Sequence, residues 1–184
     1  MTDLEKQTPQ NYVSAAGLVN GTSLNQRIRV GQVSEEVEIL DNLMQNNTPS
    51  TLYRVLDNRF VCTKDGLIQD SAFLSTSSDV EYAMSSHFMS DSTALYIIRD
   101  SNQLPSIDVV NQLGDANFES EFILPRNTKF KILRNVTYTK NNWLQLKSDF
   151  SLYNLNEREW YDVNSITEYE IAPIFSPEMN YRSL

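Results

Sequence analysis

The sequence predicts a single α+β domain in which a helical segment precedes a series of short strands. Apolar residues recur at helical spacing over 34–45, whereas from residue 51 onward they occur in short runs or alternate with polar residues. A helix followed by many strands, without regular alternation of the two, is typical of the α+β class. The 184 residues, 40% of them hydrophobic, suffice for one domain with a buried core.

Each element has its own local signal. Ser34 is the expected N-cap of the first helix, two acids follow it in the first turn, and Pro49 prevents its continuation. A second, shorter helix is expected over 79–89. In the strand expected from residue 129, Phe130 and Ile132 alternate with lysines, which predicts one buried and one exposed face. The expected strands are 52–56, 73–76, 94–98, 106–110, 120–124, 129–139 and 168–175.

Composition argues against several kinds of function. The chain has 24 acidic and 15 basic residues and a net charge of −9, which disfavours binding to nucleic acid or to an anionic membrane, although 126–140 is a basic stretch. No apolar run reaches the ~18 residues of a membrane span, and 1–10 does not resemble a secretion signal. With Cys62 and His87 as the single cysteine and histidine, we expect no disulfide and no metal cofactor.

Three short motifs contain residues suited to chemistry. The first is Arg54 within an apolar strand, where it must face either an anionic partner or solvent. The second is the run Phe73-Leu74-Ser75-Thr76-Ser77, whose hydroxyls could equally cap the helix that follows. The third is Glu119-Ser120-Glu121, in which strand alternation would direct both carboxylates to one face. That carboxylate pair could instead be a charged strand edge that blocks aggregation.

Taken in order, the three motifs resemble the arginine–serine–glutamate branch of the mono-ADP-ribosyltransferases, which includes bacterial toxins and phage enzymes. The resemblance extends upstream to Leu24-Asn25-x-x-Ile28-Arg29 and downstream to Leu124-Pro125-x-x-Thr128-x-Phe130. It implies two short antiparallel-rich sheets that pack at a steep angle around an NAD cleft, with flanking helices. We expect a monomer with a transferase domain over 22–175, a loosely ordered lead-in over 1–21 and a C-terminal tail over 176–184.

The resemblance implies four main roles at the site. Glu121 is expected to hold the ribose 2′-OH of NAD and to stabilise the positive charge that develops when nicotinamide departs. Glu119 is expected to orient and deprotonate the acceptor. Ser75 would hydrogen-bond to Glu121 and orient it, and Arg54 would pair with an NAD phosphate.

Five further residues are expected around these four. Thr76 and Ser77 would brace the strands around bound NAD. Val55 stands where many relatives have glycine, at a position whose backbone contacts nicotinamide. Phe88 would pack against nicotinamide, and Phe118 would pack against the acceptor.

The activity implied is transfer of ADP-ribose from NAD to a target protein. The acceptor expected is arginine, because the first glutamate of Glu-x-Glu goes with arginine acceptors in this family. The alternatives are a Thr or Ser hydroxyl acceptor, a nucleic-acid acceptor, hydrolysis of NAD, or a non-catalytic binding module on the same scaffold. A glycoside hydrolase is disfavoured, because its carboxylates must flank the sugar bond. The expected setting is a bacterial effector, toxin or phage enzyme that modifies a host or competitor protein in the target-cell cytosol.

Overall fold

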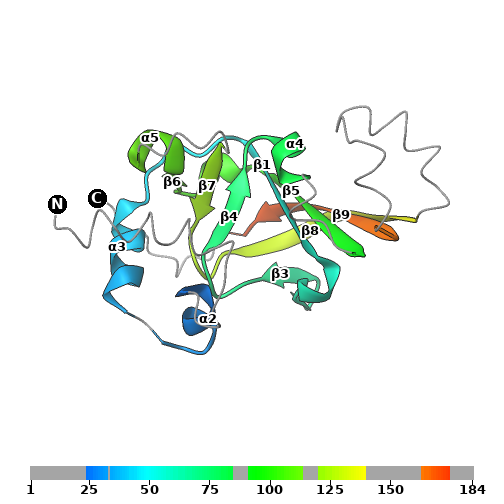
Figure 1. Cartoon of the computed structure of the whole chain (residues 1–184), viewed down its shortest axis with the longest axis horizontal. Coiled ribbons are helices and arrows are strands. Elements are labelled where there is room, and N and C mark those ends of the chain that lie inside the picture. Colours follow the sequence, from blue (N-terminus) through cyan, green and yellow to red (C-terminus); the bar gives the residue numbers. More distant parts are fainter. Residues whose placement is uncertain (1–23, 33, 85–90, 114–119, 140–162, 175–184) are drawn as a thin grey trace.

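The computed structural model describes residues 24–32, 34–84, 91–113, 120–139 and 163–174 (Figure 1). The helices are α2 (Leu24–Arg29), α3 (Glu35–Leu43), α4 (Val80–Ala83) and α5 (Val109–Leu113), with short 3-10 helices η1 (Asn58–Phe60) and η2 (Ser101–Gln103). The strands are β1 (Thr51–Asp57), β2 (Thr63–Lys64), β3 (Leu67–Gln69), β4 (Leu74–Ser77), β5 (Ser92–Arg99), β6 (Ile107–Asp108), β7 (Glu121–Leu124), β8 (Lys129–Thr139) and β9 (Ser165–Pro173).

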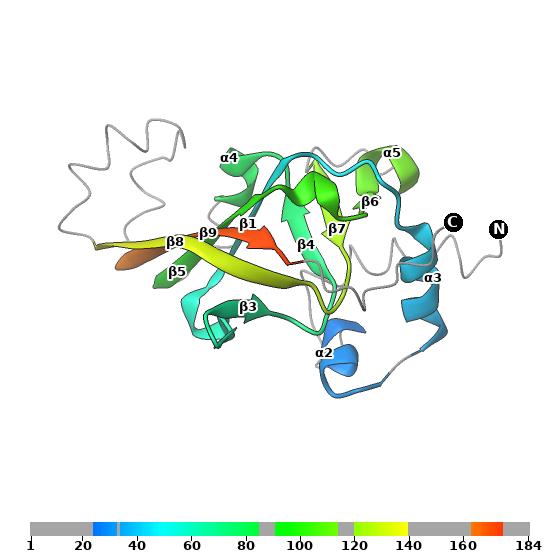
Figure 2. The same cartoon turned by 180° about the vertical axis from the view of Figure 1, so that it is seen from behind.

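The strands form one nine-stranded sheet in the order β2-β3-β8-β9-β5-β1-β4-β7-β6. β1 pairs with β5 along its whole length but with β4 only at Tyr53 and Ser77. The sheet therefore consists of two parts, β2 to β1 and β4 to β6, that meet at a single residue pair. β4 and β7 run across the direction of β8 and β9 (Figures 1 and 2). The α+β class is confirmed, and the two expected sheets are present as these two joined parts.

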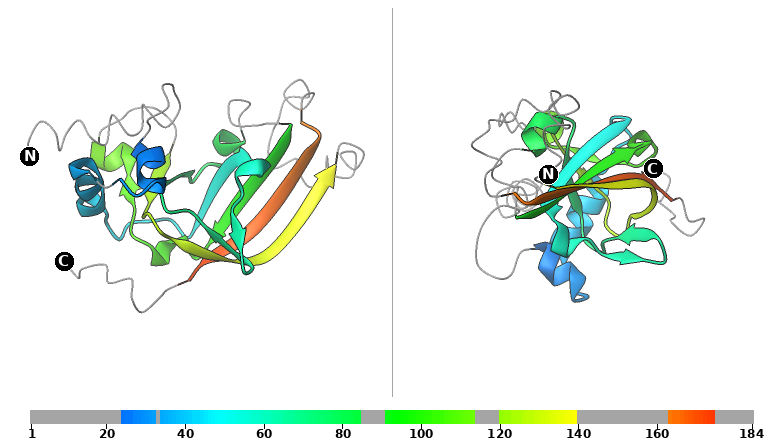
Figure 3. Two further views of the ribbon diagram at one scale, coloured as in Figure 1. Left: turned by 90° about the horizontal axis from the view of Figure 1, so that it is seen from below. Right: turned by 90° about the vertical axis from the view of Figure 1, so that its right-hand side faces the viewer.

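Three groups of buried apolar residues hold the parts together. The first lies between the two parts of the sheet and includes Leu52, Ile98, Leu124 and Phe130. The second packs α2 and α3 against the β4–β7–β6 part, and the third packs α4 against β1 and β5 (Figure 3). The second includes Ile28, Leu40, Phe73 and Ile123, and the third includes Met84, Leu95 and Ile166.

The helix predicted over 34–45 is present as α3, whereas the one predicted over 79–89 is shorter, because α4 ends at Ala83 with Met84 as its C-cap. Ser34 precedes α3, but its hydroxyl donates to the Glu36 carboxylate at 3.0 Å and makes no side-chain cap bond. α4 is capped by Asp79, whose Oδ1 accepts from the backbone N–H groups of Glu81 and Tyr82 at 2.8 and 3.2 Å. The remainder of the predicted helix, 85–89, lies outside the described residues.

Most predicted strands are present with ends shifted by up to three residues. The exception is 106–110, where β6 ends at Asp108 and α5 begins at Val109. The Asp108 carboxylate accepts from the backbone N–H of Asn111 at 3.0 Å, so it caps a helix where the apolar run predicted a strand. In β8, Phe130 is buried beside exposed lysines, as the alternation predicted. Within the described ranges, no helix is long and apolar enough to cross a membrane.

Candidate active site

Arg54 lies beside the point where pairing between β1 and β4 stops. It follows Tyr53, the residue of β1 that pairs with Ser77. Its Nη1 donates to the backbone carbonyl oxygen of Ser75 at 2.5 Å. The Arg54 side chain therefore links β1 to β4 at the point where backbone pairing between these strands ends. Its Nε is buried and has no hydrogen-bond partner among the residues that the structure describes. An unpaired buried donor is costly, and an anionic ligand at this junction would satisfy it.

Glu121 is the first residue of β7 and pairs with Ser77 of β4. Its side chain is buried, with 9% of the residue exposed. Ser75, two residues before Ser77, points to the same face of the sheet because side chains alternate along a strand. Diagonal neighbours such as Ser75 and Glu121 lie ~7–8 Å apart in an antiparallel pair. The structure thus places Arg54, Ser75 and Glu121 on the neighbouring strands β1, β4 and β7, with the Arg54 side chain bonded to the Ser75 backbone.

The other two residues of the Ser-Thr-Ser run make contacts that hold β4 in place. The Thr76 hydroxyl donates to the backbone carbonyl oxygen of Phe122 at 2.7 Å and ties β4 to β7. The Ser77 hydroxyl accepts from the backbone N–H of Asp79 at 2.9 Å, at the start of α4. Thr76 points away from the Ser75 face, because the two residues are neighbours on one strand. The Ser77 side chain lies on the same face of the sheet as that of Ser75.

Val55 presents its backbone, rather than its side chain, to the Arg54 side of β1. Its side chain is buried in the group that packs α4 against β1 and β5, on the face opposite to Arg54. A valine in place of glycine therefore adds no side chain on the face from which Arg54 projects.

The structure describes only part of the Glu-x-Glu motif. Ser120 has a φ of 43°, in the left-handed region, and its carbonyl oxygen accepts from the backbone N–H of Ser78 at 3.1 Å. β7 begins only at Glu121, so the strand alternation that was expected to align Glu119 with Glu121 does not extend across Ser120. Glu119 itself lies outside the described residues, as do Phe88 and Phe118.

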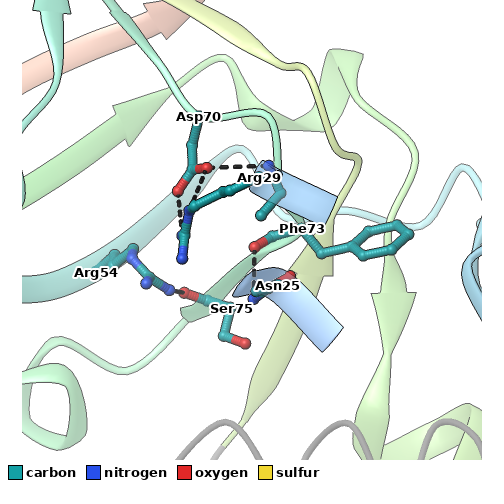
Figure 4. Close-up of polar contacts among 7 residues, drawn as sticks. Asn25, Arg29, Arg54, Asp70, Phe73 and Ser75 are labelled. Atoms are coloured by element: carbon teal, nitrogen blue, oxygen red, sulfur yellow. Dashed lines mark hydrogen bonds and ion pairs between the residues drawn. The ribbon is translucent and has the colours of Figure 1, made fainter. Parts of the chain in front are cut away.

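A second arginine, Arg29, lies near Arg54 (Figure 4), and the sequence motifs indicated no role for it. In α2, Arg29 Nε donates to Asp70 Oδ1 at 3.0 Å and Nη2 donates to Oδ2 at 2.6 Å (Figure 4). Asn25 Nδ2 donates to the backbone carbonyl oxygen of Phe73 at 3.3 Å. These contacts attach α2 to the chain that leads into β4. Asn25 and Arg29 were visible in the upstream motif, whereas nothing in the sequence singled out Asp70.

The carboxylate of Asp70 is ionised more readily than usual. Burial by itself raises the pKa of Asp70, but the hydrogen bonds from Arg29 and from the Ala72 amide, with the charges of Arg29 and Arg54, hold that pKa below its usual value. Elsewhere at the junction, burial raises the pKa of Tyr96, the residue of β5 that pairs with Arg54. Among the described residues, no group of three or more His, Cys, Asp or Glu side chains could hold a metal ion.

Comparison with known proteins identifies the fold. No family model matches the sequence, and no curated protein matches it. Among solved structures, Plx2a, an ADP-ribosyltransferase toxin from Paenibacillus larvae, superposes with a TM-score of 0.58 at 14% identity, over 95% of this chain and 88% of Plx2a. The ADP-ribosyltransferase Vis, solved with an inhibitor, gives a TM-score of 0.60 at 17% identity, over 96% of this chain and 75% of Vis.

Exoenzyme S from Pseudomonas aeruginosa, solved with human 14-3-3 protein beta and carba-NAD, gives a TM-score of 0.56 at 13% identity, over 97% of this chain and 80% of its own. Structural similarity at sequence identities of 13–17% establishes the fold but does not establish the activity. The protein therefore has the fold of the bacterial ADP-ribosyltransferase toxins, as the sequence motifs implied.

Proposed function

We propose that the protein is a mono-ADP-ribosyltransferase that transfers ADP-ribose from NAD to a target protein, with arginine as the acceptor. The observation that carries the proposal is the set of Arg54, Ser75 and Glu121 on three neighbouring strands at the junction of the two sheet parts. The fold of ADP-ribosyltransferase toxins and a fold relative bound to the NAD analogue carba-NAD support it.

In the first step, the bond between ribose C1′ and the nicotinamide nitrogen breaks, and its electron pair leaves with nicotinamide. The pyridinium nitrogen thereby loses its positive charge, and the ribose becomes an oxocarbenium ion. Glu121 holds the 2′-OH and stabilises the cation, because a buried carboxylate acts on a nearby charge more strongly than a solvated one. Arg54 fixes the diphosphate, for which a planar guanidinium with several donors is well suited.

In the second step, a guanidinium nitrogen of the acceptor attacks C1′ and forms the new N-glycosidic bond. Arginine has a pKa above 12, so attack requires a base to take a proton from this nitrogen. We assign that role to Glu119. Ser75 orients Glu121, Phe88 packs on nicotinamide and Phe118 packs on the flat acceptor group.

The remaining assignments follow from the same proposal. Thr76 and Ser77 brace the strands around NAD, and the backbone of Val55 contacts the nicotinamide amide. The transferase domain spans 22–175 and acts as a monomer without a metal. The protein is a bacterial effector or toxin, or a phage enzyme, that acts on a host or competitor protein in the target-cell cytosol.

Incubation of the full chain with NAD labelled in the adenine ring tests this function. Nicotinamide release and label in a protein acceptor are measured in one reaction with a cell lysate. Transfer requires both signals, NAD hydrolysis gives nicotinamide without protein label, and a non-catalytic module gives neither. The Glu121→Gln variant is the matched control, since the amide keeps the size of the side chain and removes its negative charge.

A further inference from the structure

Asp70 lies in the turn between β3 and β4 and accepts three hydrogen bonds. Two come from Arg29, whose Nε and Nη2 reach separate carboxylate oxygens at 3.0 and 2.6 Å. The third comes from the backbone N–H of Ala72 at 3.0 Å. A two-point bond between guanidinium and carboxylate fixes the plane of the arginine as well as its distance. The Ala72 bond in turn fixes the carboxylate to its own turn, so that Asp70 is a rigid support for Arg29.

The guanidinium group of Arg54 also interacts electrostatically with the Asp70 carboxylate. Arg29 contacts the Asp70 carboxylate directly, and the charges of both Arg29 and Arg54 lower the pKa of Asp70. Figure 4 shows the two guanidinium groups and the Ser75 carbonyl on the same side of Asp70. Two positive groups and one negative group leave a net charge of +1. Without Asp70, the two guanidinium groups would repel one another and Arg29 would lose a fixed direction.

We propose that Asp70 is a positioning residue, which holds Arg29 beside Arg54 so that the two guanidinium groups together form the site for the diphosphate of the dinucleotide. This inference rests on the proposed function, because it assumes that the diphosphate of NAD binds at Arg54. Asp70 does not touch the ligand in this arrangement. It acts by orienting Arg29 and by offsetting the repulsion between the two arginines.

The test measures binding of ADP-ribose, which keeps the diphosphate and cannot react, to the full chain by calorimetry. The variant Asp70→Asn keeps an oxygen that can accept from the Ala72 amide but removes the charge. We expect it to bind ADP-ribose about tenfold more weakly, within the range of coupling between contacting residues. In NAD turnover, we expect KM to rise by the same factor while kcat changes less than twofold. Nicotinamide riboside, which lacks the diphosphate, should inhibit turnover equally well in both proteins.

The matched control is Glu170→Gln. Arg99 Nε donates to Glu170 at 2.7 Å, and the side-chain exposures of that pair, 45% and 30%, are close to the 45% and 31% of Arg29 and Asp70. Glu170 pairs with Ile97, the neighbour of Tyr96, and so lies on the face of the sheet opposite to Arg54. We expect its ADP-ribose affinity to stay within twofold of the wild type.

A double-mutant cycle shows whether Asp70 acts through Arg29. Arg29→Gln alone should weaken ADP-ribose binding at least as much as Asp70→Asn, and the double variant should bind no more weakly than Arg29→Gln. Arg29→Gln leaves the Asp70–Ala72 turn intact, so it tests the inference even if Asp70→Asn does not fold.

Four outcomes contradict the inference. Unchanged or tighter binding by Asp70→Asn overturns it, and so does unchanged binding by Arg29→Gln. Additive losses in the double variant show that Asp70 does not act through Arg29. Equal loss of affinity for nicotinamide riboside shows a general structural defect. A wild-type chain that binds no ADP-ribose overturns the proposed function itself, whereas the other outcomes leave that function standing.

Discussion

The guanidinium group of Arg54 donates a 2.5 Å hydrogen bond to the backbone carbonyl oxygen of Ser75. The bond joins β1 to β4 one residue beyond their single ladder pair, Tyr53 with Ser77. It thus fixes Arg54 at the point where the two parts of the sheet separate. The same side chain that we assign to the diphosphate of NAD also holds that junction in place.

Substitution of Arg54 by lysine tests this double role. Lysine keeps the charge but has one nitrogen in place of a planar fork, so it cannot bond Ser75 and a phosphate in the same geometry. We expect the KM for NAD to rise by roughly tenfold or more, in line with 1.5–3 kcal/mol for hydrogen bonds to charged groups. The control is Arg126→Lys, since Arg126 is also held by a side-chain bond, an ion pair with Asp41 at 2.9 Å, and has no role in the proposed site. An equal rise in KM in both variants would show that the effect is not specific to Arg54.

Glu121→Gln should abolish both ADP-ribosyl transfer and NAD hydrolysis, because both pass through the oxocarbenium ion that Glu121 stabilises. The expected loss is on the order of 10²–10³ in rate. Rates of nicotinamide release with and without acceptor give the measurement, and thermal unfolding verifies that the variant is folded. A folded Glu121→Gln variant with normal hydrolysis would remove Glu121 from the catalytic role.

Glu119→Gln should separate the two activities. If Glu119 acts only on the acceptor, the variant loses transfer while nicotinamide release remains measurable. The comparison with Glu121→Gln is informative because the two changes are chemically identical and differ only in position. Equal loss of NAD hydrolysis in both variants would contradict the division of roles between the two glutamates.

The sequence predicted those elements whose periodicity spans enough residues to be distinctive. α3 has nine residues and β8 has eleven, and both were expected. α2 has six residues and β2 has two, which is too few for a helical or alternating pattern, so neither was expected. At 106–110 the apolar residues predicted a strand. The strand ends at Asp108, because that side chain caps a helix that begins at Val109.

The sequence motifs also proposed three main site residues, which the structure places on neighbouring strands, but they did not indicate how these residues are held. Arg54, Ser75 and Glu121 were expected from the order of the three motifs and their resemblance to the mono-ADP-ribosyltransferases. The Arg54–Ser75 bond depends on where pairing between β1 and β4 stops, which no local pattern encodes. The Arg29–Asp70 pair joins residues 41 positions apart, so it could be found only once α2 was seen against the β3–β4 turn.

The lowered pKa of Asp70 predicts how the free energy of unfolding changes with pH. Because its pKa is lowered in the folded protein, its contribution to folding is complete above the unfolded-state pKa of about 3.9 and is lost as the pH falls through the lower folded-state value. Asp70→Asn should therefore reduce the free energy of unfolding at pH 7. A reduction of about 0.2–1 kcal/mol is expected, since the pair is partly exposed and screened by solvent.

Urea unfolding of both proteins from pH 7 to pH 2 measures this difference. The difference in free energy of unfolding between wild type and Asp70→Asn should be constant above about pH 5 and should decrease toward zero below pH 4. It should also shrink in 1 M salt, because screening weakens exposed pairs. A gap that widens on acidification would mean that Asp70 is not ionised in the folded protein.

The identity of the acceptor can be read from the chemistry of the product. An N-glycosidic bond to arginine should be released by neutral hydroxylamine, whereas a bond to a Thr or Ser hydroxyl should resist it. We expect release, because Glu119 can pair with a cationic guanidinium and then take its proton. Phe118 can in addition pack on the flat face of the guanidinium, a contact of roughly 0.5–2 kcal/mol. Mass spectrometry of the labelled lysate protein identifies the modified residue directly. A hydroxylamine-resistant product that maps to Thr or Ser would make the arginine assignment wrong, while the transferase function would stand.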